Sequence, residues 1–314
     1  MSAKESLLAT LGVLGDCLKD GALIDKNLTD HDLRASMLRQ GLAVLAFATM
    51  ESFIRERTGE LLRSFSNPLL TFTDLLPALQ RATTLGALEG IRFRLKLRPV
   101  QERVNWLVGA LAPVASATSN LAQLSTHSFG QAASNLIEDD IQEILKAFGV
   151  KDPWKQITEL SRRLGVGTLD SRSEFIAIKE RRHDSAHALS ANVLHPDLEG
   201  SLRSVLAICI GFDLLISHAH GLTNLKLGPS TGNRPLMAHT DVKLLFVTQQ
   251  PGPAKRFAVR KEQLPPPAPT LNKSLRILPD VSSAITFARS YASARRIQVV
   301  VLDGISAPRD WINW

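Results

Sequence analysis

Cysteine is scarce in this sequence: its 314 residues include two, Cys17 and Cys209. They lie far apart, each within an apolar stretch of helical spacing, so they form neither a disulfide framework nor a Cys-x-x-Cys metal site. We expect both thiols to be buried as small apolar groups, in a chain that works in the reducing cytoplasm.

The sequence also lacks a segment that targets or spans a membrane. Its N-terminal stretch carries Glu5 and Asp16 where a signal peptide has a basic start and an unbroken apolar core. The most apolar run, Val205 to Ile216, is too short to cross a bilayer and contains Asp213. We therefore expect a soluble cytoplasmic protein that has no membrane partner.

Several common catalytic signatures are missing as well. The chain contains no Walker phosphate loop, no Gly-x-Gly-x-x-Gly, no Gly-x-Ser-x-Gly and no His-Glu-x-x-His. Nucleotide hydrolases, dehydrogenases, serine esterases and the common zinc peptidases therefore lose support as functional classes.

Aromatic residues make up only 5% of the chain, whereas Leu and Ala are abundant, and this balance favours helices. In the second predicted helix, the main apolar stripe consists of Leu38, Leu42, Leu45, Ala46 and Phe53. Phe47 and Ile54 lie on another side, so contacts on two faces are expected. Apolar residues at helical spacing predict helices over residues 2–18, 27–64, 74–96, 101–111, 137–148, 154–164, 171–188 and 195–219.

Two further parts of the helical region bear on the expected structure. Residues 113–135 are rich in Ala, Ser and Thr and fit either a small-residue helix or a loose connection. His218 and His220 end the last predicted helix, where a positive charge suits the helix dipole.

The composition changes after Gly221. Residues 222–240 are rich in Gly, Pro, Ser, Thr and Asn, which predicts a linker. Beyond it, the sequence predicts strands over 242–248, 256–260 and 297–302 and an amphipathic helix over 282–296. We therefore expect a mainly α protein with a helical domain over 1–221, a linker over 222–240, and a small α/β domain over 241–314.

The charge balance suits an anionic partner. The formal net charge is +7 and the isoelectric point is about 9.6. A basic protein attracts nucleic acid, although many basic proteins are merely soluble. A nucleic-acid function therefore depends on finding a site with matching chemistry.

The segment Arg182-His183-Asp184-Ser185-Ala186-His187 concentrates such chemistry. Arg presents planar donors that match phosphate oxygens, and His gives or takes a proton near neutral pH. Arg182 and His187 are five residues apart, roughly 140° around a regular helix. They could meet if the helix frays near Ser185, or if a second subunit brings the same helix across a two-fold axis.

Two other interpretations of this segment compete with phosphoryl transfer. The charged residues from Glu180 to Asp184 fit a solvated helical face with salt bridges, the usual fate of a charge run. His183 and His187 have the i, i+4 spacing of zinc ligands, and Glu180 with His183 matches half of a di-iron pattern. A metal site needs further ligands, which the sequence does not supply.

The spacing from Arg182 to His187 resembles the Arg-x(4–6)-His motif of the HEPN superfamily. HEPN domains are helical, and their motif helix is followed by a further long helix, as predicted here over 195–219. A polar residue often follows the Arg, and His183 fills that place. The apolar helix around Glu51 is similar to a helix with an embedded acid in bacterial members. The resemblance covers most of the predicted helical domain.

This resemblance implies a HEPN-like helical bundle that acts as a metal-independent endoribonuclease, usually as a homodimer and often as a toxin or in antiphage defence. Arg182 and His187 take the family's catalytic roles, and His183 occupies the variable polar position. Arg181 could replace Arg182 at a longer spacing. The resemblance implies RNA as the partner, with an antitoxin or defence-system protein beside it, and no metal or cofactor.

The implied mechanism uses the 2′-OH of the RNA as the nucleophile. His187 acts as general base or acid, and His183 is a second proton carrier or a phosphate ligand. Arg182 clamps the non-bridging oxygens, where negative charge grows in the transition state. The products carry 2′,3′-cyclic phosphate and 5′-hydroxyl ends, and DNA resists because it lacks the 2′-OH.

Three further residues are candidates for contact with the substrate. Asp184 and Ser185 either cap the helix end or touch RNA. Glu51 either pairs with Arg55 on its own helix or is partly buried and orients Arg182 or a histidine. The alternative to an enzyme is a HEPN-like scaffold that binds RNA, nucleotide or protein without cutting, since several HEPN domains have lost activity.

Overall fold

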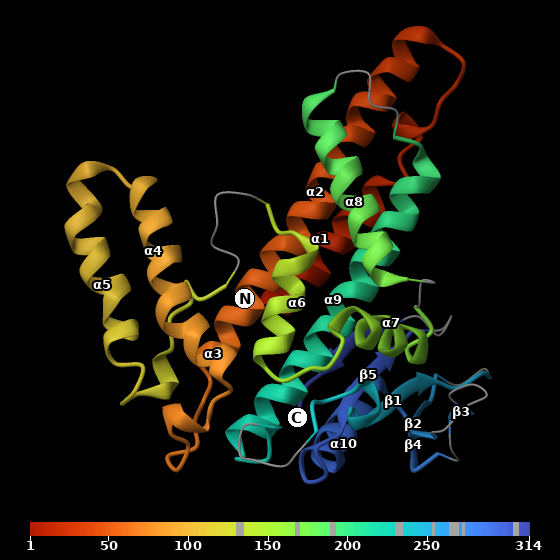
Figure 1. Ribbon diagram of the computed structural model, residues 1–314. Helices are drawn as coiled ribbons and strands as arrows, with labels where there is room; N and C mark the ends of the chain where they lie inside the picture. The colour runs from red at the N-terminus through yellow and green to blue at the C-terminus, as the bar shows by residue number, and fades with distance from the viewer. Residues whose placement is uncertain are drawn as a thin grey trace.

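The computed structural model describes residues 1–129, 135–166, 170–188, 193–229, 235–252, 255–263, 270–271, 274–303 and 308–314. It is mostly helical with a small mixed sheet near the C-terminus (Figure 1), which confirms the mainly α class with a small C-terminal α/β part. The helices are α1 (Ala3–Cys17), α2 (Thr29–Leu62), α3 (Pro77–Arg81), α4 (Ala87–Lys96), α5 (Arg103–Ala115), α6 (Glu138–Ala147), α7 (Pro153–Arg163), α8 (Ser171–His187), α9 (His195–Asn224) and α10 (Val281–Ser293). The strands are β1 (Leu244–Gln249), β2 (Phe257–Gln263), β3 (Thr270–Leu271), β4 (Arg276–Leu278), β5 (Gln298–Leu302) and β6 (Pro308–Ile312).

The segment predicted as one helix over 74–96 is interrupted. Its α-helical part begins at Pro77, in the first turn of α3, where a missing backbone N–H costs no hydrogen bond. A π-helical turn over Ala82–Gly86 then joins α3 to α4. At Gly86 an added Cβ would lie 3.0 Å from the backbone oxygen of Ser128, so this turn lets another part of the chain approach closely.

The ambiguous segment 113–135 is a helix end followed by a connection. α5 stops at Ala115, and a short 3-10 turn over Leu121–Gln123 follows. Residues 130–134 of this segment lie outside the described residues. None of the residues of α5, all of which are described, is buried, so the α4–α5 hairpin adds little to the core.

α2 packs against α1, α8 and α9, and this threefold contact sets which of its sides is buried. Phe47, Met50 and Ile54 have at most 1% of their surface exposed. The predicted stripe was therefore wrong in part, because Leu38 and Leu45 are 45% and 53% exposed. Phe53 is buried as predicted.

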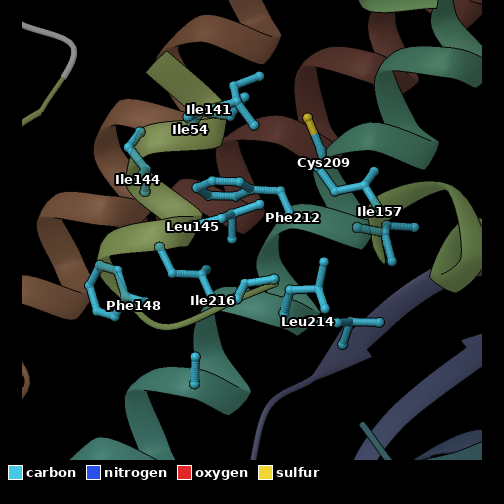
Figure 2. Packing of buried hydrophobic residues seen from close by; sticks show 14 of the residues in the cluster. Ile54, Ile141, Ile144, Leu145, Phe148, Ile157, Cys209, Phe212, Leu214 and Ile216 are labelled. Atoms are coloured by element: carbon cyan, nitrogen blue, oxygen red, sulfur yellow. The ribbon is translucent and has the colours of Figure 1, made fainter. Parts of the chain in front are cut away.

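α9 forms the centre of the core. It is long and apolar enough to cross a membrane by length and composition, and most of that stretch is buried inside the protein. Figure 2 shows Phe212 and Ile216 of α9 near Leu145 of α6 and Phe148, which follows the end of α6. The prediction for the two thiols was right for Cys209, which is buried, and wrong for Cys17, which is exposed.

The sheet has the strand order β3-β2-β1-β5-β6, with β4 also paired to β2. β1 and β5 are parallel, as expected for strands joined through a helix, here α10. Side chains alternate along β1. Leu244 and Phe246 join the helical core, and Leu245 and Val247 pack with residues of α10. The sheet is therefore covered on both faces, and its central strands match the predicted ones.

The predicted linker over 222–240 is partly structured. Its first residues belong to α9, which continues to Asn224. Its later part is attached to the helical body, because Met237 forms an isolated parallel bridge with Val150. Residues 230–234 lie outside the described residues. One hydrophobic cluster contains residues of the helices and of one face of the sheet, and the other face packs with α10 in a second cluster.

A buried carboxylate connects three elements of this core. Asp213 of α9 accepts hydrogen bonds from Arg57 Nε of α2 at 2.6 Å, from Ser217 Oγ at 2.7 Å, and from Trp311 Nε1 of β6 at 2.6 Å. Asn313 adds a fourth donor at 3.1 Å. The charge is thus fully paired, as a buried charge must be.

A second buried ion pair fixes the sheet to the helices. Arg163 of α7 donates from Nε to Glu262 of β2 at 2.9 Å and from Nη2 to the carbonyl of Val242 at 2.7 Å. The two charged side chains are 6% and 3% exposed. Breaking either partner would leave an uncompensated charge in the interior.

The histidines near the end of α9 are not the exposed cations that the sequence indicated. His218 and His220 are buried, and burial lowers the pKa of each to about 4. His220 packs against the ring of Phe65, with 4.4 Å between ring centroids. Both imidazoles are therefore neutral at pH 7.

We expect the free energy of unfolding to fall as the pH drops from about 6.5 to about 4. In this window the unfolded histidines take up protons and the folded ones do not, so protonation favours the unfolded chain. The loss should be about 2 kcal/mol per buried histidine at pH 5. Urea unfolding at pH 7 and pH 5 measures the decrease in the free energy of unfolding. His220→Leu should remove about half of the decrease that is due to the two histidines. His183→Leu changes an exposed imidazole and should keep the full drop; an unchanged drop in His220→Leu would contradict the prediction.

Candidate functional site

α8 carries the candidate residues, and its two halves differ in burial. Asp170 caps its start by accepting hydrogen bonds from the amides of Arg172 and Ser173 at 3.2 and 3.3 Å. Phe175 and Ile178 anchor the first half in the core. Residues 179–187, all of which are described, include no buried residue. The sequence thus places its polar segment on the more exposed half of a firmly anchored helix.

An open hollow of about 540 Å³ lies between this half of α8 and the start of α6. An ion pair holds its walls together. Lys179 of α8 binds Glu138 of α6, with 2.7 Å between Nζ and Oε2. The residues lining the hollow are Asn135, Ile137, Lys179, Glu180, Arg182, His183 and Asp184. Three of the predicted site residues therefore share one surface depression.

Arg182 is the available cation of this hollow. Within the described part of the chain its guanidinium makes no hydrogen bond and no ion pair, whereas Lys179 is engaged by Glu138. This hydrogen bond from Lys179 lowers the pKa of the Glu138 carboxyl. Glu180 and Asp184 also line the hollow, so its charges are mixed. Arg182 can contact an anion there without first breaking a contact seen among the described residues.

The two imidazoles of the motif lie next to each other on the exposed side of α8. The rings of His183 and His187 are 4.7 Å apart between centroids, at an interplanar angle of 53°. Their i, i+4 spacing on one helix face produces this contact. Among the residues that the structure describes, no group of three or more His, Cys, Asp or Glu side chains could hold a metal ion.

His187 and Arg182 are not brought together within one chain. α8 is helical up to His187 and does not fray at Ser185, so the two residues keep the separation of roughly 140° around its axis. Arg182 lines the hollow and His187 does not. A site that uses both groups on one phosphate requires a second copy of α8.

The other candidate residues of α8 differ in how accessible their polar groups are. Arg181 donates from Nη1 to Ser201 Oγ of α9 at 2.6 Å, which ties it to the neighbouring helix. The Ser185 hydroxyl is buried, with no hydrogen-bond partner among the described residues, and does not face the solvent. Asp184 accepts the amide of Ala188 through its backbone oxygen, and its side chain lines the hollow.

Glu51 pairs with Arg55, with 2.7 Å between Oε1 and Nη2. It also accepts the amide of Leu136 at 3.1 Å, and Leu136 lies between the hollow-lining residues Asn135 and Ile137. Glu51 therefore holds the wall of the hollow opposite α8. Of the two alternatives in the sequence, the pair with Arg55 is present.

Sequence reasoning missed the far wall of the hollow. Lys179 could have been found, because it lies three and four residues before Arg182 and His183 and shares their helix face. No local sequence pattern marks Asn135 and Ile137 as site residues, since their position near α8 depends on contacts between segments that are far apart in the sequence. The chain matches no protein-family model, no curated protein and no solved structure.

Proposed function

We propose that this protein is an endoribonuclease that cleaves RNA without a metal ion, by attack of a 2′-OH on the adjacent phosphate. The observation that carries the proposal is Arg182, a cation without a partner among the described residues, beside His183 in an open hollow. His187 lies one turn further along the same helix. These are the group types that stabilise a phosphorane and move two protons.

In this mechanism one imidazole takes the proton of the 2′-OH as its oxygen bonds to phosphorus. The bond from phosphorus to the 5′-oxygen breaks, and the leaving oxygen receives a proton from a second imidazole. Arg182 donates hydrogen bonds to the non-bridging oxygens, whose negative charge increases on the way to the phosphorane. The products are a 2′,3′-cyclic phosphate and a 5′-hydroxyl.

The proposal includes a homodimer in which α8 of each copy completes the site of the other. Such an interface needs apolar surface near α8. α2 packs along α8 and exposes Leu33, Met37, Leu38 and Leu45, each between 45% and 61%. A two-fold axis beside these residues would bring His187 of one copy toward Arg182 of the other.

We expect the wild-type protein to cleave total RNA in the presence of EDTA and to leave cyclic-phosphate ends. Arg182→Ala and His187→Ala should each lower the rate by about 10²–10⁴-fold, because each removes a transition-state contact or a proton carrier. Arg172→Ala changes an exposed arginine at the other end of α8 and is the matched control. Intact RNA at stoichiometric protein, or cleavage that needs added zinc or manganese, would refute the proposal.

A non-catalytic scaffold is the second candidate, and the mixed charge of the hollow favours it. Glu180 and Asp184 face the same space as Arg182 and weaken its attraction for a polyanion. The same assay distinguishes the two functions: RNA that is bound with the help of Arg182 but remains intact would identify a scaffold. For the enzyme, a role as a toxin or defence effector predicts that expression stops growth and that His187→Ala does not.

A further inference from the structure

A second hollow, of about 650 Å³, lies far from α8, where the end of α9 meets the α/β part. The end of α9, the segment leading into β1, and the turn between α10 and β5 contribute to it. Its apolar wall consists of Leu222, Leu227, Pro229, Pro235, Met237 and Ala294. Its volume is that of a small-molecule site.

The rim of this hollow is basic. Lys243, Arg295 and Arg296 line it together with a single acid, Asp241. Arg295 is partly engaged, because its guanidinium lies 4.1 Å from the centroid of the Tyr291 ring. Lys243 and Arg296 make no ion pair within the described part of the chain. These two cations are available to an anionic ligand.

His218 also lines this hollow and supplies a hydrogen-bond donor. Its Nδ1 accepts a hydrogen bond from Trp314 Nε1 at 3.1 Å. Because the ring is neutral, its proton is then on Nε2. This N–H has no hydrogen-bond partner among the described residues, and His218, which is 5% exposed, lines the hollow. The donor is therefore available to a ligand there.

Arg296 occupies a backbone conformation that normally belongs to glycine. Its φ is 56°, just after the end of α10, where the amide of Ile297 returns to the carbonyl of Ala292. A glycine is common at this position because it adopts the left-handed region without strain. An arginine near a helix C-terminus also suits the dipole, but Lys243 lies on no helix and is not explained in that way.

We propose that this hollow binds a small phosphate-bearing ligand with a planar or apolar part, such as a nucleotide. Lys243 and Arg296 contact the phosphate, and His218 donates a hydrogen bond to the ligand. The planar part lies against Leu222 and Met237. The inference is independent of the proposed nuclease activity, because it rests on a different surface and is tested by binding alone.

Isothermal titration with AMP, inorganic phosphate and adenosine tests the proposal on the full chain. We expect AMP to bind once per chain and more tightly than either of its parts. Lys243→Gln should weaken AMP binding about tenfold through the loss of one charge-assisted contact. Lys19→Gln alters an exposed lysine elsewhere and should leave binding unchanged.

Arg296→Gly separates the loss of the ligand from damage to the fold. It should weaken AMP binding about tenfold and raise the Tm by about 2 °C, because glycine relieves the left-handed strain. No AMP binding at millimolar concentration would overturn the proposal. The proposal would also be overturned if Arg182→Ala removed AMP binding while Lys243→Gln and Arg296→Gly left it intact, since the ligand would then lie at α8.

Discussion

Mixing the Arg182→Ala variant with the His187→Ala variant is expected to restore about a quarter of the wild-type RNA cleavage that each variant alone has lost. Half of the dimers in an equal mixture contain one copy of each variant. In such a dimer one of the two composite sites combines the intact Arg182 with the intact His187. The other site has neither group, so half of the sites in half of the dimers are active.

The physical reason for this expectation is the regular end of α8, which keeps the two groups on different sides of one helix. Rates are measured after the two variants have been unfolded and refolded together, so that subunits exchange. The matched control is a mixture of Arg182→Ala with the Arg182→Ala/His187→Ala double variant, which contains no complete site. Two inactive variants whose mixture stays inactive would refute the shared site.

Replacing Asp213 with alanine is expected to lower the free energy of unfolding by about 3–5 kcal/mol. Asp213 is buried, and its carboxylate accepts hydrogen bonds from Arg57, Ser217, Trp311 and Asn313. Its removal leaves the Arg57 charge and the Trp311 N–H in the interior without this acceptor. Such a loss is a large part of the stability of an ordinary domain.

Urea unfolding followed by tryptophan fluorescence and by circular dichroism measures this change. Asp16→Ala removes a carboxylate of the same type from a surface pair, whose side chains are 75% and 78% exposed, and should change stability by less than about 0.5 kcal/mol. If Asp213→Ala unfolded at the same urea concentration as Asp16→Ala, the connecting role of Asp213 would be refuted.

Elements with a strong local signal could be predicted from the sequence. β1 and β5 are runs of buried apolar residues, and α10 begins after Asp280, which accepts the amide of Ser283 at 2.8 Å. Apolar residues at helical spacing predicted α8, and the structure places its clustered polar groups on its exposed half. In each case, residues close together in the sequence determine the secondary structure.

The remaining features depend on which surfaces meet. α2 offers two apolar sides, and its contacts with α8 and α9 bury the side of Phe47 and leave Leu38 exposed. His218 and His220 are covered by Trp314, which follows β6, and by Phe65, which follows α2, and no local pattern reveals these contacts. For the same reason the sequence could not show that Glu51 supports the wall of the α8 hollow.

The position of Asp213 also has a consequence for how the chain matures. Trp311 and Asn313, two of its four donors, are synthesised about a hundred residues after the acid itself. The same late segment supplies Asp310, which binds Lys4 near the beginning of the chain with 2.7 Å between Nζ and Oδ1. A nascent chain that stalls before β6 therefore lacks two of the four donors to the Asp213 carboxylate. The buried charge of Asp213 therefore gains its full set of partners only after β6 has been made.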